Sequence, residues 1–349
     1  MATMKDVAKL AGVSVSTVSR VINNSLPVDN ETRRRVEDAV LKTSFRPNLL
    51  ARGLRSKSGN LIGLIVPEIV HESFSFFVNF AEASAERHGF NLVIGNTNND
   101  PDKEEQFVRN FIRRHVDGVI FSRVSDQSRI FRIIEESQVP FVIIDRSMKR
   151  EDVPTVVMDN YGAGVIAAKH LLDLGHEDLA CITGPMNIAI VRDRFSGFRD
   201  TIVARGGRLP DSHVLEADFK FEGGKHAARR LLEDRIDFTA LWAQNDLMAV
   251  GAMNEFISHG IAVPGDVSIM GLDNVTVSWM VNPALTTIAQ PFAEMCESAV
   301  KMIVSMRAKE SIAEWLVTHS PALVVRDTTS IRSSGPRARL RAAAKSRPR

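Results

Sequence analysis

The sequence has few of the features that mark secreted, membrane-spanning or metal-binding proteins. Only two of its 349 residues are cysteines, Cys181 and Cys296, and their spacing supports neither a metal site nor a disulfide framework. Both stand in apolar patterns, so we expect reduced core residues. No stretch of about 18 apolar residues occurs, and no apolar signal region precedes the first predicted helix. We therefore expect a cytoplasmic protein that does not contact a membrane.

Catalytic signatures are absent as well. The chain has no P-loop, no G-x-G-x-x-G opening a helix after a first strand, no H-E-x-x-H and no G-x-S-x-G elbow. His71, His115, His170 and His176 are scattered, and surface or helix-capping roles explain them better than a proton relay. We expect a protein that is not an enzyme, with no catalytic residues, no cofactor and no metal site.

The positive charge is concentrated at the two ends of the chain, although the formal net charge is only +2. Residues 1–60 hold 11 Lys and Arg against 5 Asp and Glu, and residues 332–349 hold 7 basic and no acidic residues. Residues 61–331 hold 26 basic and 37 acidic residues. This distribution favours a nucleic-acid partner for the N-terminal segment and an acidic body that stays off the phosphates.

Residues 4–24 read as two short helices joined by a glycine turn. Thr3 caps the first helix, Val7, Leu10 and Ala11 form its apolar stripe, and Gly12 ends it. Ser14 caps the second helix, whose inward residues are Val18, Val21 and Ile22. Its outward residues are Val15, Ser16, Ser19 and Arg20, short side chains followed by a guanidinium that can span O6 and N7 of a guanine. The alternative is a small three-helix bundle with a solvated arginine.

A third helix is predicted from Asp29 to about Thr43, with Glu31 and Arg35 as an i,i+4 pair. The basic segment from Arg46 to Asn60 follows, in which Leu50 and Leu54 share one side of a short helix. So short a helix is marginal in water, and the glycine at position 53 costs roughly another 1 kcal/mol. The segment is either a helix that folds only against a partner, such as a minor groove, or a flexible linker.

The motifs KDVAKLAGVS, TVSRVIN, ETR, RPN and A-R-G-L (51–54) resemble the DNA-binding headpiece and hinge helix of the lactose-repressor/galactose-repressor (LacI/GalR) family of bacterial transcription regulators. The resemblance implies that Val15, Ser16 and Arg20 read base edges and that Leu54 wedges the central step of a double-stranded operator. The DNA-binding residues that it implies are Lys5, Ser14, Val15, Ser16, Thr17, Ser19, Arg20, Asn23, Asn48, Ala51, Leu54 and Arg55.

From Leu61 onward apolar strand-length runs alternate with helical patterns. The runs LIGLIV, NLVIGN, DGVIFS and PFVIID form a first series, and LACITG, HVLEAD, TALWAQN and VSIMGLD form a second. Strands of this kind, each followed by a helix, indicate parallel sheets covered on both faces, and two doubly wound α/β halves are the economical reading. This resembles the effector core of the same family, which is similar to periplasmic sugar-binding proteins.

The implied organisation is a headpiece over 1–46, a hinge helix and linker over 47–60, a two-lobed core over 61–331 and a basic tail over 332–349. Lobe 1 would comprise about 61–160 and 290–320, and lobe 2 about 161–288 and 321–331. We expect the tail to be disordered. The family's tetramers carry a leucine heptad there, and its absence favours a homodimer.

Ligands bind beyond the carboxyl ends of parallel strands, and polar residues stand there after several runs. Carboxylates, an amide and a guanidinium satisfy several hydroxyls at once, and aromatic faces stack on a sugar ring. Helix capping and core packing are the ordinary alternatives for each residue taken singly. By resemblance to sugar-binding members, Asp145, Arg194, Phe219, Asn245, Asp273 and Phe292 are expected to bind the effector. Phe74 is a further candidate for stacking on a sugar ring, and Ser73 and Arg146 would lie on the variable first-lobe side of the cleft and set which ligand fits.

The resemblance therefore implies a regulator, most simply a repressor, whose operator affinity is switched by a small sugar. A nucleoside or nucleobase effector is the alternative, and Ile188 and Ile190 speak against it, because purine-binding relatives carry polar groups there. Whether the effector induces or co-represses stays open. Two other classes of protein are less consistent with the sequence. A receptor for transported sugars would need a signal peptide. In an architectural DNA-binding protein without a ligand, the polar residues at the strand ends would have no role.

Overall fold

The computed structural model describes residues 2–23, 26–45, 59–122, 130–146 and 152–332. The chain divides into two compact units, Met1–Gly59 and Asn60–Arg349. No helix in these ranges is long and apolar enough to cross a membrane.

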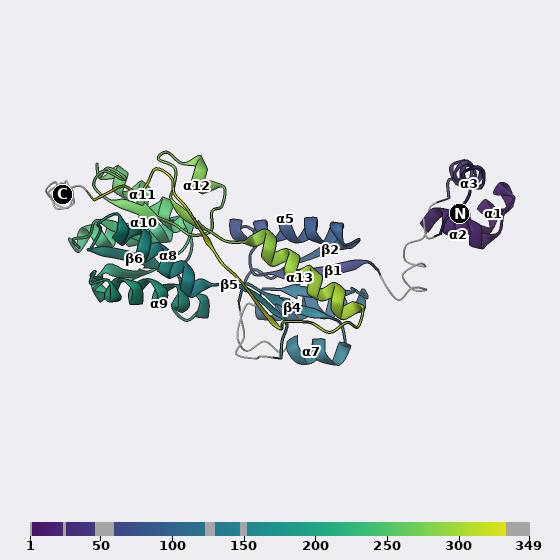
Figure 1. Cartoon of the computed structure of the whole chain (residues 1–349), viewed down its shortest axis with the longest axis horizontal. Helices are drawn as coiled ribbons and strands as arrows, with labels where there is room; N and C mark the ends of the chain where they lie inside the picture. The colour runs from purple at the N-terminus through teal and green to yellow at the C-terminus, as the bar shows by residue number, and fades with distance from the viewer. Residues whose placement is uncertain (1, 24–25, 46–58, 123–129, 147–151, 333–349) are drawn as a thin grey trace. The chain divides into compact units, whose positions relative to one another are not determined.

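The N-terminal unit is a bundle of α1 (Met4–Ala11), α2 (Val15–Asn23) and α3 (Asn30–Thr43) (Figure 1). Its ends are fixed locally, because Thr3 and Asp6 form a capping box and Gly12 ends α1 at φ 63°. The hydroxyl of Ser14 accepts the Thr17 amide at 3.0 Å and so caps α2. The small core at the centre of the bundle contains Val7, Val18, Val21, Val36 and Ala39.

Two expectations for this unit are wrong. Leu10 is 54% exposed, because the face of α1 that meets α3 is narrower than its apolar stripe and is filled by smaller side chains. Arg35 does not pair with Glu31; its guanidinium donates instead to the carbonyls of Ala11 and Gly12. These bonds satisfy orphan carbonyls at the end of α1 and tie α3 to the turn before α2.

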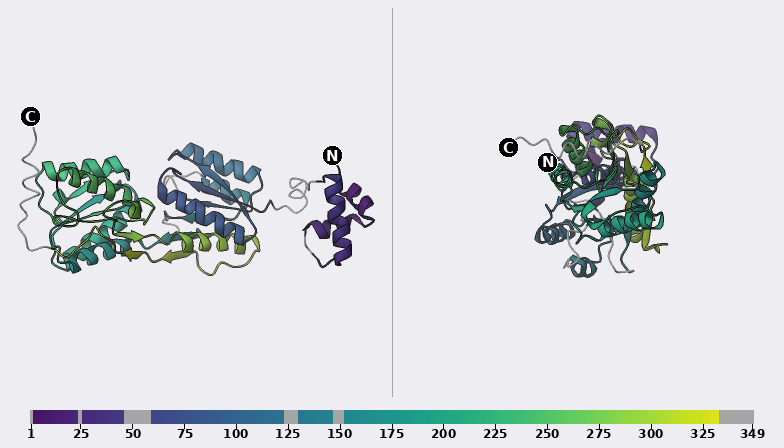
Figure 2. Two further views of the ribbon diagram at one scale, coloured as in Figure 1. Left: turned by 90° about the horizontal axis from the view of Figure 1, so that it is seen from above. Right: turned by 90° about the vertical axis from the view of Figure 1, so that its left-hand side faces the viewer.

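In the second unit, lobe 1 is a six-stranded sheet in the order β11-β5-β4-β3-β1-β2, with every neighbouring pair parallel. Helices α5 and α13 pack together on one face, and α6 and α7 pack together on the other (Figure 2). The strands are β1 (Leu61–Val66), β2 (Asn91–Asn96), β3 (Gly118–Phe121), β4 (Phe141–Ile144), β5 (Thr155–Met158) and β11 (Leu316–His319). The helices are α5 (Glu72–Arg87), α6 (Pro101–Arg113), α7 (Ile130–Ser137) and α13 (Phe292–Arg307).

Lobe 2 is a four-stranded parallel sheet in the order β7-β6-β8-β9. Helices α8 and α9 pack together on one face, and α10 and α11 on the other. The strands are β6 (Leu179–Thr183), β7 (Val214–Glu216), β8 (Ala240–Ala243) and β9 (Ser268–Met270). The helices are α8 (Asn160–Asp173), α9 (Ala189–Ala204), α10 (Phe221–Glu233), α11 (Asp246–Ser258), the short α12 (Val277–Met280) and the 3₁₀ turn η1 (Asp211–His213).

The described chain passes between the lobes three times, after β5, before α13 and after β11 (Figure 1). The strands β10 (Thr287–Ala289) and β12 (Ala322–Val324) pair as an antiparallel ribbon. The second passage begins after β10, and the third leads into β12. The strand runs expected in both series are present, and the expected fold class is confirmed. Strand β5 was not expected, because four buried residues between polar segments give too short a signal.

Candidate functional site

One side of α2 presents the side chains that the sequence assigned to base reading. Val15 is 40% exposed, and Ser16 and Arg20 are also exposed, while Val18 and Val21 point into the bundle. Ser14 is held by its cap bond to Thr17 and by a hydroxyl contact of 2.7 Å with Ser16. The front of the helix is therefore capped, free of bulky groups and followed one turn later by an exposed guanidinium, which fits entry into a major groove.

The other expected DNA-binding residues fall into two groups. Lys5 is exposed at the start of α1, and Thr17 and Ser19 are partly buried on α2. The described part of the chain does not include the side chain of Asn23. It also does not include the four expected residues of the hinge segment, Asn48, Ala51, Leu54 and Arg55. The hinge assignments therefore stay predictions.

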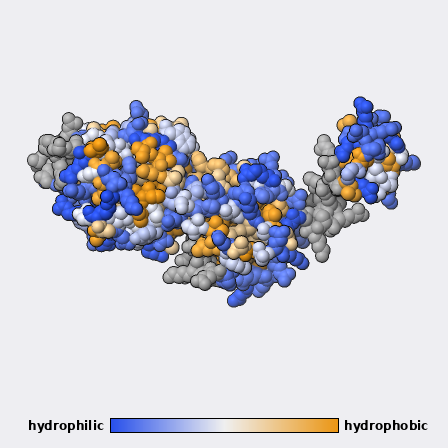
Figure 3. Space-filling view, viewed as in Figure 1, coloured by the Kyte–Doolittle hydropathy of each residue, from blue (hydrophilic) through white to orange (hydrophobic). Residues whose placement is uncertain are grey.

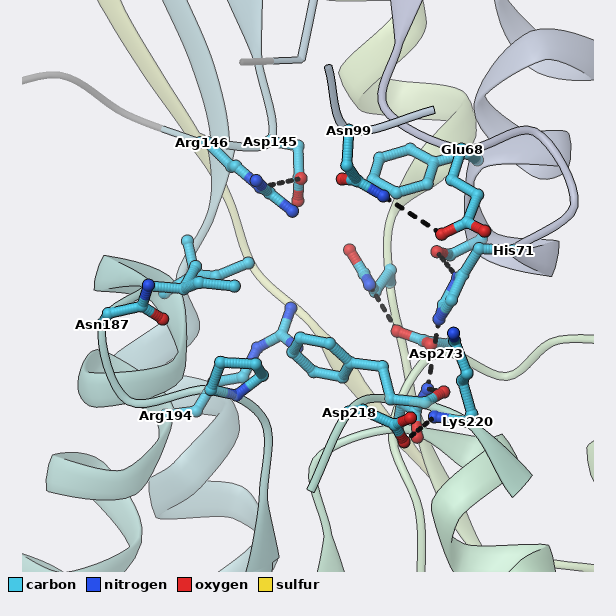
Figure 4. Close-up of a pocket in the computed structure, with 18 residues that line it drawn as sticks. Glu68, His71, Asn99, Asp145, Arg146, Asn187, Arg194, Asp218, Lys220 and Asp273 are labelled. Carbon is cyan, nitrogen blue, oxygen red and sulfur yellow. Dashed lines mark hydrogen bonds and ion pairs between the residues drawn. The ribbon is translucent and has the colours of Figure 1, made fainter. Parts of the chain in front are cut away.

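A cavity of about 400 Å³ lies between the two lobes (Figure 4). Apart from Ser73 and Phe74 on α5 and Ile190 and Arg194 on α9, the residues lining it stand in loops at the carboxyl ends of strands, where a doubly wound sheet places its ligands. They are Glu68, His71, Ser73, Phe74, Asn99, Asp145, Arg146, Pro185, Asn187, Ile188, Ile190, Arg194, Asp218, Phe219, Lys220, Asn245, Asp273 and Gln290.

Arg194 is the buried cation of this cavity, with an exposure of 3%. Its Nε donates to Oδ1 of Asn160 at 2.7 Å, and Nη1 donates to the carbonyl of Gln244 at 3.2 Å. Burial lowers the pKa of the guanidinium, and the carboxylates of Asp273 and Asp145 oppose that shift. The two hydrogen bonds to Asn160 and Gln244 thus hold the guanidinium in one orientation, near the carboxyl groups of Asp273 and Asp145. Neither of these two hydrogen bonds uses Nη2.

Two buried carboxyl groups stand beside this arginine. Burial raises the pKa of Asp273 to about 7, although Arg194 and a hydrogen bond donated by Gln290 Nε2 oppose the rise. Asp145 accepts a hydrogen bond from the Ser122 hydroxyl at 3.3 Å and lies 3.9 Å from Nε of Arg146. Oε1 of Gln290 is buried and has no hydrogen-bond partner in the described part of the chain. The site therefore offers several acceptors around one fixed donor group.

Three of the lining residues hold a left-handed backbone that favours glycine. Asp145 has φ 74°, Phe219 has φ 64° and Asp273 has φ 125°. In a non-glycine residue such a backbone conformation typically costs about 1–3 kcal/mol of free energy. The conformation persists where the surrounding structure holds it in place, often at a functional site. All three strand ends turn their side chains into one cavity, which supports a ligand-binding role for this edge.

Asn245 has a structural role as well as a place in the cavity. Its Oδ1 accepts the Met248 amide at 2.9 Å and so caps α11, which is the ordinary alternative considered above. Its Nδ2 donates to the carbonyl of Phe219 at 2.8 Å and faces Nε2 of His71 at 3.2 Å. The Phe219 and Phe74 rings both make edge contacts with His71, so aromatic groups of both lobes meet at the cavity.

The cavity thus brings together eight of the nine expected effector-binding residues and excludes one. Phe292 is 4% exposed and packs against Phe76 and Phe77 in the core of lobe 1, because it begins α13 on the side that faces α5. The lining residues that the sequence did not assign to the site are Glu68, His71, Asn99, Pro185, Asn187, Asp218, Lys220 and Gln290. All stand in loops one to five residues beyond a strand, so a search that covered the five residues after each strand would have included them. His71 was expected at the surface or as a helix cap, but its side chain makes no capping bond and lines the cavity.

Family models match both units. Residues 3–48 match the model described as bacterial regulatory proteins, lacI family, and residues 60–323 match periplasmic binding proteins and sugar binding domain of LacI family. The chain belongs to the LacI family. Its N-terminal unit is the DNA-binding part of a transcriptional regulator of that family, as the sequence predicted.

Similar proteins match this LacI-family chain over nearly its whole length. It is 35% identical to the HTH-type transcriptional regulator DegA of Bacillus subtilis (strain 168), over 94% of this chain and 98% of that protein. It is 32% identical to the ribose operon repressor of Escherichia coli (strain K12), over 93% and 99%.

Two solved structures show the same architecture. The Lac repressor dimer bound to operator and the anti-inducer ONPF aligns with a TM-score of 0.82 and 28% identity, covering 94% of this chain and 99% of that chain. The complex of the transcriptional regulator CelR with cellobiose aligns with a TM-score of 0.72 and 28% identity, covering 94% and 100%.

Proposed function

We propose that this chain is a repressor that binds a pseudo-palindromic operator as a homodimer and that a small carbohydrate in the interlobe cavity switches its operator affinity. The observation that carries the effector assignment is the grouping of Arg194 with the carboxyl groups of Asp145 and Asp273 in a cavity walled by aromatic rings. The finer domain limits proposed with it are those expected from the sequence: 1–46, 47–60, 61–331 and the tail 332–349.

The acceptors and donors of the cavity suit a neutral ligand with several hydroxyl groups. A hydroxyl can donate to a carboxylate and accept from a guanidinium, so Asp145, Asp273 and Gln290 Oε1 pair with its hydrogens while Arg194 pairs with its oxygens. Phe219 and Phe74 offer apolar surface to the C–H face of a sugar ring. A cavity of about 400 Å³ admits a sugar of one or two rings. The relative solved with cellobiose binds a ligand of this class.

A nucleoside or nucleobase is the second candidate, and one wall of the cavity disfavours it. That side of the cavity carries Pro185, Ile188 and Ile190, whose side chains offer no hydrogen-bonding group, and the amide of Asn187 is the polar group between them. A base needs donors and acceptors along one ring edge, and leaving those groups unpaired in a buried pocket costs about 1–3 kcal/mol each. The sugar is therefore the preferred proposal.

Dimer formation follows from the need to read two half-sites, since one headpiece makes too few contacts for a specific site. Lobe 2 exposes large apolar side chains on α11 and α12, two helices that contact each other: Ile257 is 46%, Trp279 is 47% and Met280 is 74% exposed. On the face seen in Figure 3, apolar surface gathers mainly over the lobe that carries α10 and α11. A second copy is the proposed occupant of this surface.

In this proposal the effector changes how the two lobes close, and closure alters the operator-binding state of the dimer. Linkage requires that operator binding change effector affinity by the same factor as effector changes operator affinity. The sign of the switch is left to experiment.

The test is fluorescence anisotropy of a labelled pseudo-palindromic duplex with a central C·G step, titrated with the full chain at two salt concentrations and against sugars and nucleobases. We expect salt-sensitive, sequence-dependent binding that one sugar weakens or strengthens. Arg194→Ala should keep operator binding and weaken the response to that sugar roughly 10- to 150-fold, since a hydrogen bond to a charged group contributes about 1.5–3 kcal/mol. Binding that is indifferent to sequence and to every ligand would overturn the proposal.

A further inference from the structure

We propose that His71 is a proton-sensitive latch between the two lobes: only its neutral imidazole accepts the hydrogen bond from Asn245 that joins lobe 1 to lobe 2, so protonation opens the cavity. The consequence for effector affinity rests on the proposed function, whereas the latch itself does not.

His71 lies where the two lobes come closest around the cavity. It precedes α5 in lobe 1 at the N-cap position, yet its side chain makes no capping bond. Its ring contacts Phe74 of lobe 1 at 5.9 Å and Phe219 of lobe 2 at 6.3 Å between centroids, both edge to face. The imidazole therefore reaches from one lobe to the other instead of serving its own helix (Figure 4).

The orientation of the Asn245 amide fixes which nitrogen of His71 carries hydrogen. Oδ1 of Asn245 accepts the Met248 amide at 2.9 Å, and Nδ2 donates to the Phe219 carbonyl at 2.8 Å. Rotating the amide by 180° would set N–H against N–H and oxygen against oxygen, so this orientation is determined by two backbone groups. The Nδ2 that faces Nε2 of His71 at 3.2 Å is thus a donor.

Nε2 of His71 must therefore hold a lone pair, and the hydrogen of the neutral ring lies on Nδ1. That hydrogen is donated to the hydroxyl of Ser73 at 2.8 Å. A protonated ring has hydrogen on both nitrogens, so Nε2–H would face Nδ2–H and the interlobe bond would be lost.

A neighbouring bond joins the same two lobes. Oε1 of Glu72 accepts the backbone amide of Thr276 at 3.1 Å. Consecutive residues at the start of α5 therefore hold two different loops of lobe 2, one before α11 and one before α12. Loss of the His71 bond removes one of these two hydrogen bonds, which weakens the closed arrangement.

The charged groups around His71 do not reverse this preference. They come from its own loop (Glu68), from the end of β4 (Asp145 and Arg146) and from α9 (Arg194), and Asp218, Lys220 and Asp273 also line the cavity. Burial lowers the pKa of His71; Glu68 and Asp145 raise it, and Arg194 and Arg146 lower it. The net direction is downward, in agreement with the neutral ring that the hydrogen bonds require.

When the lobes separate, the ring regains water and an ordinary pKa of about 6.5. The closed form has the lower pKa, so closure is fully supported above about pH 6.5 and is lost as pH falls toward the closed-state value. Between these two values the ratio of closed to open chains falls up to tenfold for each pH unit.

The first measurement is the titration of the histidine rings of the full-length chain by NMR, without ligand or DNA. His71→Gln assigns the His71 signals, and His226→Gln, at an exposed position of α10, is the matched control. We expect His71 to titrate below 6.5 with hydrogen on Nδ1, and Asn245→Ala to move its pKa upward. Hydrogen on Nε2, or a pKa at or above 6.5, would overturn the proposal.

The second measurement follows the lobes by the distance between spin labels at the exposed Lys103→Cys on α6 and Glu222→Cys on α10. We expect the distance to lengthen between pH 7.5 and 5 in the parent chain. It should stay constant in His71→Gln, because the glutamine oxygen accepts from Asn245 at every pH. An equal change in both chains would assign the opening to another group. Neither measurement depends on the operator or the effector, so failure here is distinct from failure of the proposed function.

Discussion

Nε of Arg194 donates a hydrogen bond of 2.7 Å to Oδ1 of Asn160, the first residue of α8. This bond is possible because α8 and α9 approach so closely that their backbones touch at two glycines. A β-carbon at Gly164 would collide with the Arg194 carbonyl, and one at Gly197 would collide with the Tyr161 carbonyl. The position of the central guanidinium in the cavity therefore depends on the packing of two helices.

Gly197→Ala should separate these helices. Alanine usually stabilises a helix by about 1 kcal/mol over glycine, but here the collision with a backbone carbonyl dominates. We expect a net loss of about 1–3 kcal/mol in the free energy of unfolding, measured by urea denaturation, together with weaker effector binding. Ser196→Ala, an exposed neighbour on α9, should change neither. A Gly197→Ala chain as stable as the parent would show that α8 and α9 are not in tight contact.

Arg20→Ala tests base reading by the exposed guanidinium of α2. We expect a loss of about 1–3 kcal/mol in operator binding and a relaxed preference at one guanine in each half-site, because a bidentate contact to O6 and N7 is removed. Anisotropy with operator duplexes substituted at each position measures both effects. Arg34→Ala, exposed on α3, should leave the base preference unchanged. An equal loss on random DNA would mean that Arg20 contacts only phosphate.

Effector binding near pH 7 should release protons from Asp273. Its pKa is raised to about 7, so the free site is partly protonated, whereas hydroxyls donating to the carboxylate favour the ionised form. Affinity should therefore fall as pH drops below about 7. Calorimetry in buffers of different ionisation enthalpy measures the release, which should vanish at pH 8.5 and be smaller in Asp273→Asn, where only the His71 contribution remains. Proton uptake in place of release would contradict this reasoning.

Met280→Glu should weaken the proposed homodimer, because it places a charge on the most exposed apolar side chain of α12. Analytical ultracentrifugation should show a shift toward monomer. Val203→Glu introduces the same charge at a position that is 67% exposed on α9, which packs on the opposite face of the sheet from α11. If both variants dissociate alike, or neither does, the dimer does not use α12.

Local patterns in the sequence were sufficient to predict most helices and strands. They also located most of the expected cavity residues, which stand at the carboxyl ends of the parallel strands. The run LIGLIV became β1 with the expected limits, and the Thr3 cap and Gly12 turn appear as expected, because each depends on a few adjacent residues. Asp145, Asn245 and Asp273 were located by their place after apolar strands, since parallel strands bring their carboxyl ends to one edge. The roles of these residues stay proposals.

The tertiary structure alone decided which of several suitable residues face the cavity. Phe292 and Phe219 are equally apolar in the sequence, but the first packs inside lobe 1 and the second turns into the cavity through a left-handed backbone. The bond between His71 and Asn245 joins residues 174 positions apart, and no local pattern encodes such a pair. Periodicity and caps are set by neighbours along the chain, whereas burial, pKa shifts and interlobe hydrogen bonds arise only when distant segments meet.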